Sequence, residues 1–332
     1  MQDPHVTTPV ALGAIGCSDI ARRRTLPAVT ASDATRLVCV AARDVRRARK
    51  YADEFGCAAA RSYTHLLQRP DVTAVYISLP AALHADWAER ALRAGKHVLV
   101  EKPLATDGAQ AERLARVATD LGLVLMENFA FVHHRQHAEV DLRVRRGDIG
   151  APRSFAASFT IPPRPADDIR YRADLGGGSL LDNGVYPLRA ALRFLGPGLD
   201  IAGAVLREDR DRGVVVSGSA LLVSRQGVSA HLSFGMENAY SAYYRIEGST
   251  GSLGLDRAFT PPPDHRCVLT VHGPGGEERI AMPADDQFAA MVRDFAGAVA
   301  RPGATAPALS DSLRLSALVD RIRAEAVYVT VR

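Results

Sequence analysis

Two short segments of the chain carry side chains that could move a proton or stabilise a negative charge. The first, Glu101-Lys102-Pro103, ends a run of apolar residues, and Pro103 biases Lys102 away from helical backbone geometry. The Lys102-Pro103 bond is a candidate for the cis form. Only three of the 41 basic residues are lysines, so a lysine in such a motif is less readily explained as surface charge. The simpler alternative is a lysine that extends from a strand end and pairs with Glu101.

The second segment joins Asp182 to Tyr186. A spacing of four residues places both on one face at the start of a helix, and Pro187 is tolerated there because first-turn N–H groups lack helical partners. The glycines at 176–178 allow a close backbone approach. A phenol has a pKa of about 10, so Tyr186 is protonated near neutral pH and suits proton donation to a ketone oxygen. The alternative is a tyrosine that only packs and hydrogen-bonds.

A third segment resembles a dinucleotide-binding turn. Gly16, Ser18 and Ala21 stand at its three small-residue positions, so one of the usual glycines is missing. The first position makes the tight turn, and the second lets the backbone approach a pyrophosphate at a helix N-terminus. An ordinary strand-to-helix turn capped by Ser18 or Asp19 would give the same pattern.

The end of the second expected strand bears on which dinucleotide is bound. An NAD site usually has an acidic residue there for the ribose 2′-hydroxyl, whereas an arginine accommodates a 2′-phosphate. The chain has Arg43 followed by Asp44. We assign Asp44 to the N-cap of the helix expected at 45–55 and Arg43 to the phosphate, which favours NADP(H). A surface arginine is the alternative for Arg43.

The elements that must position these residues fall into two patterns. The first 128 residues alternate helices with short apolar strands, as in a doubly wound parallel sheet, with strands expected at 10–15, 37–41, 74–78, 97–101 and 123–127. Residues 129–332 instead contain longer strands with few helices, as in an α+β domain with a large, mostly antiparallel sheet. The strands of this domain are expected at 153–160, 214–223, 227–234, 243–247, 268–271 and 327–331. Its helices are expected at 182–194, 286–300 and 310–324. The fold class is therefore α/β with an N-terminal Rossmann sheet, and the domain boundary is expected near Phe129.

Composition excludes several classes of protein. With 332 residues and 47% hydrophobic positions, two globular cores can form. The net charge of +4 comes from mixed signs without a long basic run, so no nucleic-acid partner is expected. No apolar stretch approaches the roughly 18 residues of a membrane span, and no secretion signal is evident. The cysteines are widely spaced, which favours reduced thiols in the cytoplasm and no metal site; they are Cys17, Cys39, Cys57 and Cys267.

Several motifs together resemble one family. Pro80 and His84 open a helix that ends at Ala94-Gly95-Lys96-His97, and Glu101-Lys102-Pro103 ends the next strand. The pattern returns as Gly176-Gly177-Gly178 followed by Asp182 and Tyr186-Pro187. This order resembles the glucose-fructose oxidoreductase, inositol dehydrogenase and rhizopine-catabolism (Gfo/Idh/MocA) family over most of the chain. The resemblance implies a Rossmann domain at 1–128, and at 129–332 a domain with an open sheet that binds substrate and forms a dimer or tetramer.

The resemblance also implies roles for the site residues. The family's lysine, here Lys102, contacts the nicotinamide ribose and the reacting oxygen of the substrate. Most relatives have a histidine where this chain has Tyr186, and the tyrosine resembles the sugar 3-ketoreductases of deoxysugar (antibiotic) biosynthesis. The expected catalytic residues are Lys102, Tyr186 and Asp182. The expected cofactor contacts are Gly16, Cys17, Ser18, Asp19, Ile20, Arg43, Ser78, Leu79, Pro80, His84, Glu101 and Lys102.

Other polar residues are weaker candidates. Arg164, Arg170, Tyr171 and Arg172 lie in a Pro-rich loop and could bind a substrate diphosphate and stack on its base, although a structural role explains them equally well. Asn128 follows the fifth parallel strand and could line the cleft. The substrate contacts are thus expected at Lys102, Asn128, Arg164, Tyr171, Asp182 and Tyr186. Adjacent His133 and His134 begin a polar helix, where solvation is the usual outcome, so they are left out of catalysis.

These expectations lead to one main hypothesis and two alternatives. The main hypothesis is NADPH-dependent reduction of a keto group, at C-3, on a dTDP-linked deoxysugar, with the proton from Tyr186 or Lys102. The first alternative is an NAD(P)-dependent dehydrogenase of a free sugar, polyol or cyclic diol. The second is a non-catalytic NADP-sensing regulatory protein on the same fold, against which the combination of Lys102, Asp182 and Tyr186 argues.

Overall fold

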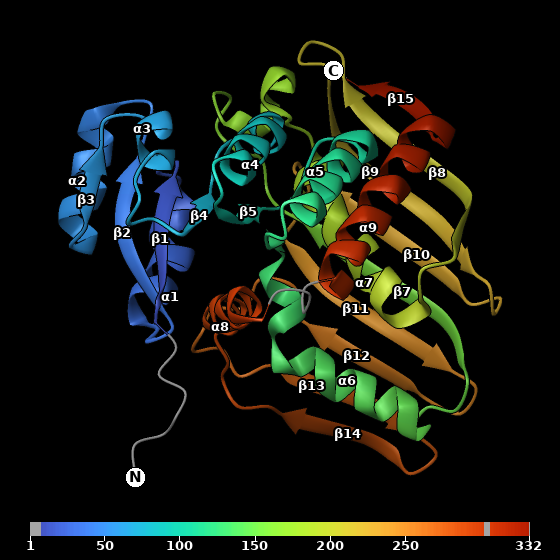
Figure 1. Cartoon of the computed structure of the whole chain (residues 1–332). Helices are drawn as coiled ribbons and strands as arrows, with labels where there is room; N and C mark the ends of the chain where they lie inside the picture. The colour runs from blue at the N-terminus through green and yellow to red at the C-terminus, as the bar shows by residue number, and fades with distance from the viewer. Residues whose placement is uncertain (1–7, 302–305, 332) are drawn as a thin grey trace, which may run out of the picture. The chain divides into compact units, whose positions relative to one another are not determined.

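The computed structural model describes residues 8–301 and 306–331, which form two compact units (Figure 1). The first unit contains residues up to Ala130 together with Phe288–Leu313, and the second contains Phe131–Gln287 and the residues from Arg314 onward. The expected second domain was one continuous segment, 129–332. The structure differs because helix α8 (Gln287–Ala300) buries Met291 and Phe295 in the core of the first unit.

The first unit is built on a parallel six-stranded sheet with the order β3-β2-β1-β4-β5-β6. The chain leaves β1 toward β2 and β3 and later returns to place β4, β5 and β6 on the other side. The carboxyl ends of β1 and β4 therefore flank the point where strand order reverses, which is where open α/β sheets bind ligands. The strands are β1 (Val10–Ile15), β2 (Thr35–Ala41), β3 (Ala58–Ala60), β4 (Ala74–Ile77), β5 (His97–Glu101) and β6 (Leu125–Asn128).

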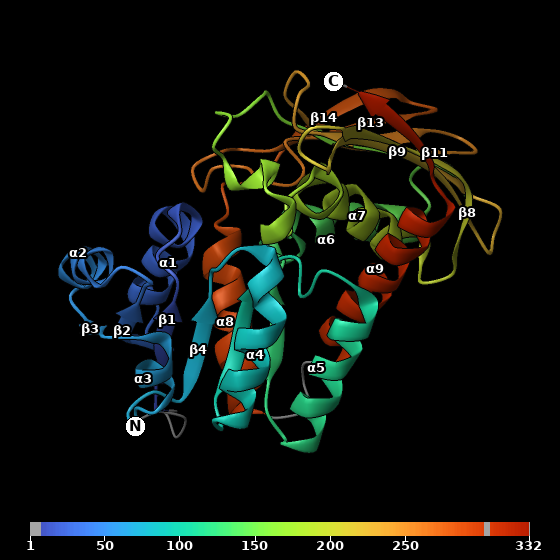
Figure 2. The same cartoon turned by 90° about the horizontal axis from the view of Figure 1, so that it is seen from above.

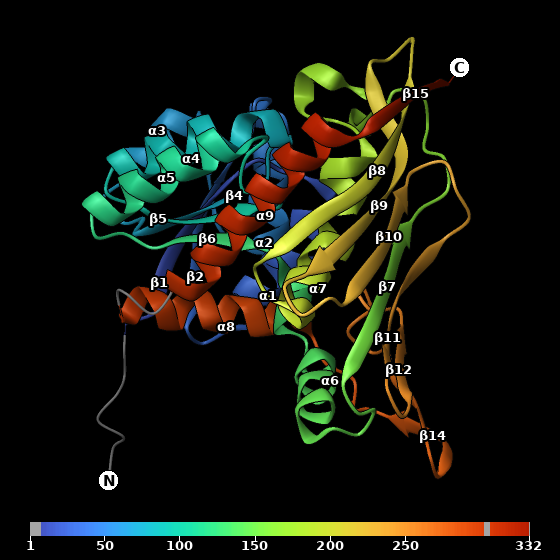
Figure 3. The same cartoon turned by 90° about the vertical axis from the view of Figure 1, so that its right-hand side faces the viewer.

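Helices cover both faces of this sheet, which explains why its central strands are apolar throughout (Figure 3). One hydrophobic core joins the sheet to α1, α2 and α8, and the other joins it to α3, α4 and α5. The helices of the first 130 residues are α1 (Leu26–Ala31), α2 (Val45–Phe55), α3 (Tyr63–Leu67), α4 (His84–Arg93) and α5 (Gly108–Asp120). The predicted doubly wound parallel sheet is confirmed.

The second unit contains a mixed nine-stranded sheet with the order β14-β13-β12-β11-β7-β10-β9-β8-β15. Two pairs, β7 with β10 and β8 with β15, are parallel and the others are antiparallel, so the mostly antiparallel sheet is confirmed. The strands are β7 (Pro152–Thr160), β8 (Leu199–Asp209), β9 (Val214–Ser224), β10 (Ser229–Gly235), β11 (Ser241–Gly248), β12 (Ser252–Asp256), β13 (Val268–Gly273), β14 (Gly276–Ala281) and β15 (Val327–Val331).

One face of the nine-stranded sheet carries helices. Figure 2 shows α6 (Arg135–Arg146) and α7 (Val185–Leu195) on the same side of the sheet, and no helix of the described residues in this unit covers the opposite face. The last helix, α9 (Ala306–Glu325), leads into β15. Among the residues that the structure describes, none of the helices combines the length and the apolar character that crossing a membrane requires.

Candidate active site

The tight turn after β1 requires a glycine. Gly16 has a φ of +97°, and a Cβ at this position would lie 2.7 Å from the carbonyl oxygen of Ser78. The Ser78 hydroxyl donates to the Gly16 carbonyl at 3.0 Å. The turns after β1 and β4 are therefore packed backbone to backbone at the switch point. Because Gly16 has no side chain, the turn after β1 stays open for a phosphate.

The helix that follows this turn begins with a side-chain cap. The Ser18 hydroxyl accepts a hydrogen bond from the Ala21 amide at 3.2 Å, so the capping alternative for Ser18 is also realised. Asp19 is exposed and pairs with Arg23 at 2.6 Å, which offsets a negative charge at the helix N-terminus. The turn can thus present backbone N–H groups to an anion.

Four other expected cofactor contacts lie along the same edge. The Cys17 thiol is buried, and burial raises its pKa to about 11, so it is an uncharged packing group. Ile20, Leu79 and Pro80 are half-buried, and the last two form the turn that leaves β4. Their accessible surface suits apolar contact with a ring or ribose.

Two charged residues, Arg43 and Asp44, follow β2. Asp44 is the N-cap of α2, where its carboxylate accepts from the Arg46 amide at 2.9 Å and pairs with the Arg46 guanidinium at 3.0 Å. The assignment of Asp44 to the helix is confirmed. Arg43 is exposed at the carboxyl end of β2, the position from which an arginine can reach a 2′-phosphate.

Glu101 is a buried carboxylate at the end of β5. One of its oxygens accepts from the Tyr76 hydroxyl and from the Asn128 amide, both at 2.6 Å. Burial raises the pKa of Glu101 to about 6, although these two hydrogen bonds and the ammonium of Lys102 favour the charged form. The Asn128 amide also donates to Thr25 at 3.3 Å. Asn128 was expected to contact substrate, but it is 2% exposed and its amide nitrogen serves Glu101.

The segment after Lys102 is held by residues that the sequence patterns did not single out. The Lys102-Pro103 bond is cis, and the Leu104 amide donates to Glu127 at 2.8 Å. The Ser312 hydroxyl donates to the other oxygen of Glu127 at 2.6 Å. Glu127 is buried at the end of β6, and an acidic residue inside an apolar strand was the available signal.

His84 joins the turn after β4 to the turn after β5. Its Nδ1 lies 2.7 Å from the Pro103 carbonyl oxygen and its Nε2 lies 2.7 Å from the Leu79 carbonyl oxygen. Burial and the charge of Lys102 lower the pKa of His84. A doubly protonated ring, which could donate to both carbonyls, is therefore disfavoured. His84 was expected to contact the cofactor, but both ring nitrogens are occupied by backbone, so it positions these turns.

The second unit places Asp182 and Tyr186 at a change in helix geometry. A π-helical turn (Leu180–Gly184) leads directly into α7, and such turns recur at functional sites. Asp182 accepts from the Arg170 guanidinium at 2.6 Å. The half-buried Tyr186 ring packs against three phenylalanines with centroid distances of 5.8, 4.8 and 5.7 Å, namely Phe131, Phe159 and Phe259.

The Pro-rich loop differs from its expected role in base stacking. Tyr171 is buried, and the Arg212 guanidinium covers its ring at 4.2 Å, so this ring cannot stack on a base. The Tyr171 hydroxyl accepts from the Arg164 amide at 3.3 Å. Arg172 pairs with Asp174 at 2.6 Å. Arg164 has an exposed side chain and stays a candidate for a diphosphate.

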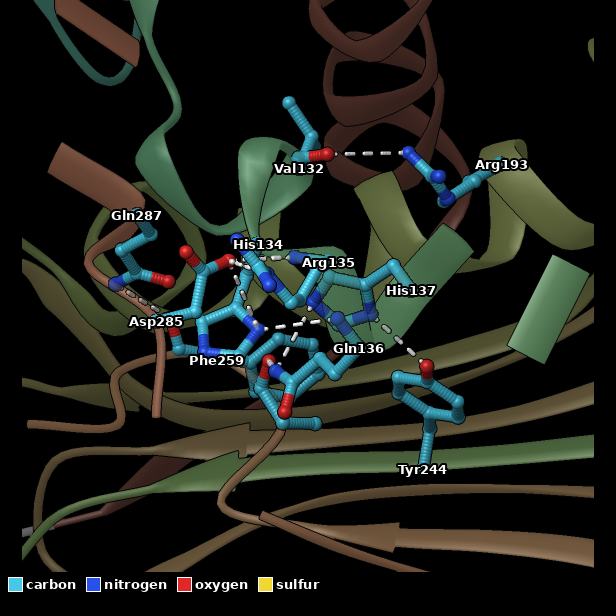
Figure 4. Close-up of polar contacts among 11 residues, drawn as sticks. Val132, His134, Arg135, Gln136, His137, Arg193, Tyr244, Phe259, Asp285 and Gln287 are labelled. Atoms are coloured by element: carbon cyan, nitrogen blue, oxygen red, sulfur yellow. Dashed lines mark hydrogen bonds and ion pairs between the residues drawn. The ribbon is translucent and has the colours of Figure 1, made fainter. Parts of the chain in front are cut away.

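A buried polar cluster lies beside Phe259 (Figure 4). The expected solvation of His134 is wrong, because its side chain is inaccessible to solvent. Its Nδ1 accepts a hydrogen bond from the backbone N–H of Gln136 and lies 3.9 Å from the Asp285 carboxylate. His137 is also buried and makes a 2.9 Å hydrogen bond to the Tyr244 hydroxyl. Gln136 donates to the Ala258 carbonyl at 2.8 Å, which fixes the backbone next to Phe259. The cluster therefore supports the wall of Tyr186.

The doubly wound sheet, the glycine turn at its switch point and the arginine after β2 define a dinucleotide-binding protein of the Rossmann class. Residues 10–129 match the model of an oxidoreductase family with an NAD-binding Rossmann fold, and residues 137–254 match the GFO/IDH/MocA C-terminal domain. The chain belongs to the Gfo/Idh/MocA oxidoreductase family. The expected family and the expected enzyme class, an oxidoreductase, are confirmed.

Individual relatives are similar over nearly the whole chain. The dTDP-3,4-didehydro-2,6-dideoxy-alpha-D-glucose 3-reductase of Actinomadura kijaniata is 53% identical over 97% of this chain and 97% of its own. The enzyme of the same name from Streptomyces violaceoruber is also 53% identical, over 100% of both chains. The crystal structure of KijD10, a 3-ketoreductase from Actinomadura kijaniata in complex with NADP and TDP-benzene, matches with a TM-score of 0.96 and 53% identity, covering 98% of this chain and 100% of that chain.

Proposed function

We propose that the protein uses NADPH to reduce the C-3 keto group of a dTDP-linked deoxysugar. The observation that carries this proposal is the end-to-end similarity to dTDP-sugar 3-reductases in a chain that has Tyr186 one turn after Asp182 and Lys102 at the end of β5. The bound NADP and TDP-benzene of KijD10 support the choice of cofactor and nucleotide.

The residues of this chain would divide the work by their chemistry. NADPH, when bound, supplies the hydride, and Gly16, Ser18 and Arg43 would hold its phosphates. The Tyr186 phenol donates a proton to the carbonyl oxygen, and the Lys102 ammonium stabilises the negative charge that develops there. Asp182 orients the substrate, and its side chain is itself held by the Arg170 guanidinium at 2.6 Å.

Turnover of candidate substrates tests this proposal. The oxidation of NADPH is followed with dTDP-linked 3-keto sugars, and free sugars and polyols are offered with NADP⁺ in the reverse direction. Turnover of the nucleotide sugars is the expected result. Oxidation of free polyols alone would favour a dehydrogenase, and NADPH binding without any turnover would favour a sensor.

Two variants assign the roles within the reaction. Lys102→Ala and Tyr186→Phe should each lower kcat by about 100-fold or more while the Kd for NADPH changes little, because both side chains act on the reacting oxygen. A Tyr186→Phe variant with the rate of the wild type would mean that the proton comes from another group, with Lys102 the next to test.

The same proposal extends to assembly and location. We propose that a second copy covers the helix-free face of the nine-stranded sheet, since exposed apolar side chains of β8, β9 and β15 lie there: Val205, Leu221, Val327 and Val329. Val205→Glu should then shift the mass measured by light scattering toward the monomer. The four free cysteines, three of them buried, support function in the reducing cytoplasm.

A further inference from the structure

One arginine of the Pro-rich loop is attached to the start of the Tyr186 helix at several points. The Arg170 Nε donates to the Asp182 carboxylate at 2.6 Å, and its Nη1 donates to Asp168 at 3.1 Å. The Arg170 carbonyl accepts from the Gly178 amide at 2.8 Å. A single residue therefore links the loop to the glycine run and to the carboxylate one turn before Tyr186.

The glycine run is required by this attachment. A Cβ at Gly177 would lie 2.5 Å from the Arg170 carbonyl oxygen and 2.7 Å from that of Arg172, a distance that no side chain tolerates. The close approach expected from the glycines is thus made by the loop of the same chain. Since the backbone at 170–172 cannot shift away without breaking these contacts, the Arg170 side chain is delivered to Asp182 in a fixed position.

The pair also settles the charge beside Tyr186. Asp182 is 23% exposed and Arg170 is 33% exposed, so water screens their interaction only in part. Asp182 raises the pKa of Arg170, so the guanidinium keeps its positive charge beside Asp182 at any working pH. Without the guanidinium, Asp182 would lose the 2.6 Å hydrogen bond from Arg170 and the positive charge that comes with it.

We propose that Arg170 is a positioning residue that orients Asp182 and cancels its charge, so that a diphosphate-bearing substrate is accepted beside Tyr186. This inference rests on the proposed function for the identity of the substrate. Arg170 acts on the substrate through Asp182, whereas the exposed Arg164 would contact a diphosphate directly.

A double-mutant cycle with Arg170→Met, Asp182→Asn and their combination tests the inference, with Arg172→Met as the matched control. Arg172 is two residues away in the same loop, and its exposed pair with Asp174 mirrors the Arg170 pair without touching Asp182. Arg170→Met should raise the KM for the dTDP sugar about 10- to 100-fold and leave the Kd for NADPH unchanged. Adding Asp182→Asn should return KM to within a few-fold of the wild type, although kcat stays at the level of Asp182→Asn alone.

Three outcomes would overturn the inference. The first is an Arg170→Met variant with the same KM as Arg172→Met. The second is a combined variant whose KM stays as high as that of Arg170→Met, because this result would indicate a purely structural arginine. The third outcome needs no substrate. The effects of the two single substitutions on the free energy of unfolding would add up to the effect of the double substitution, which would mean that positions 170 and 182 are not coupled. A failure of the proposed function would appear separately, as a wild-type protein that does not turn over dTDP sugars.

Discussion

Replacing Glu101 with glutamine should stabilise the first unit near neutral pH. The pKa of Glu101 is about 6 in the folded chain and 4.5 in the unfolded reference, so folding favours the protonated acid. The stabilisation is complete below about pH 4.5 and is lost as the pH rises through 6. Each pKa unit corresponds to about 1.4 kcal/mol, so the ionised carboxylate costs about 2 kcal/mol at pH 7–8. This value already includes the hydrogen bonds from Tyr76 and Asn128, and the amide oxygen of the substituted side chain can still accept from both.

The chain offers a local probe for this measurement. Trp87 is the single tryptophan and lies in α4 of the first unit, with its indole against Tyr63. Its fluorescence therefore reports unfolding of the unit that contains Glu101. Urea unfolding of the wild type and of Glu101→Gln is compared from pH 4.5 to pH 8. The difference between the two proteins isolates Glu101, because the buried histidines are common to both.

The expected difference grows from near zero at pH 4.5 to about 2 kcal/mol in favour of the variant above pH 7, or roughly 4–8 °C in Tm for a unit of this size. A difference that does not change with pH would refute the reasoning, since it would show that Glu101 has the same pKa in both states. A variant that is less stable at pH 8 would show that the ionised form is preferred. A stable Glu101→Gln with reduced turnover would place the carboxylate among groups kept for function at a cost in stability.

Three further substitutions test single contacts. Arg43→Ala should weaken NADPH binding about 10- to 100-fold and NADH binding much less, and equal losses in the two Kd values would show that Arg43 does not read the 2′-phosphate. His84→Gln removes the rigid ring that places one nitrogen against each of two carbonyls, and it should weaken both NADPH binding and kcat, unlike His97→Gln at the opposite end of β5; the same loss in both variants would contradict this. Phe159→Ala should lower kcat and shift its pH profile by freeing the Tyr186 ring, whereas Phe159→Leu should keep most of the rate; an unchanged profile for Phe159→Ala would refute this.

The sequence was sufficient for the architecture wherever periodicity was strong. The apolar strands β1, β2, β4, β5 and β6 are fully or mostly buried between helices, and this burial is what made their runs continuous. The strand β8 was missed because its alternation is broken by a register shift near Gly203 and its outer face is exposed. The return of α8 to the first unit could not be seen, because an apolar helix does not specify which core it enters.

Sequence motifs singled out the residues that we propose to react, and they did not reveal the groups that hold the surroundings of these residues. Tyr171 and His134 have the residue types of ligand contacts, yet each is buried against a partner distant in sequence, Arg212 and Asp285 respectively. Such pairings depend on tertiary packing, which spacing along the chain does not encode. The same holds for Asn128, whose amide nitrogen bonds with Thr25 and Glu101.

The three lysines show what scarcity can and cannot indicate in a chain whose usual cation is arginine. Lys50 is exposed on α2, as expected for surface charge. The Lys96 ammonium donates to the carbonyls of Arg69 and Val72 at 2.9 and 2.7 Å, a convergent arrangement that suits a compact group with several donors better than a planar guanidinium. Lys96 is therefore held in place, and it ties backbone segments together at the end of β5 opposite to Lys102. The scarcity of lysine identifies positions where the geometry of an ammonium group matters. Of these positions, Lys102 is the one to test for catalysis, because it lies at the carboxyl edge of the parallel sheet.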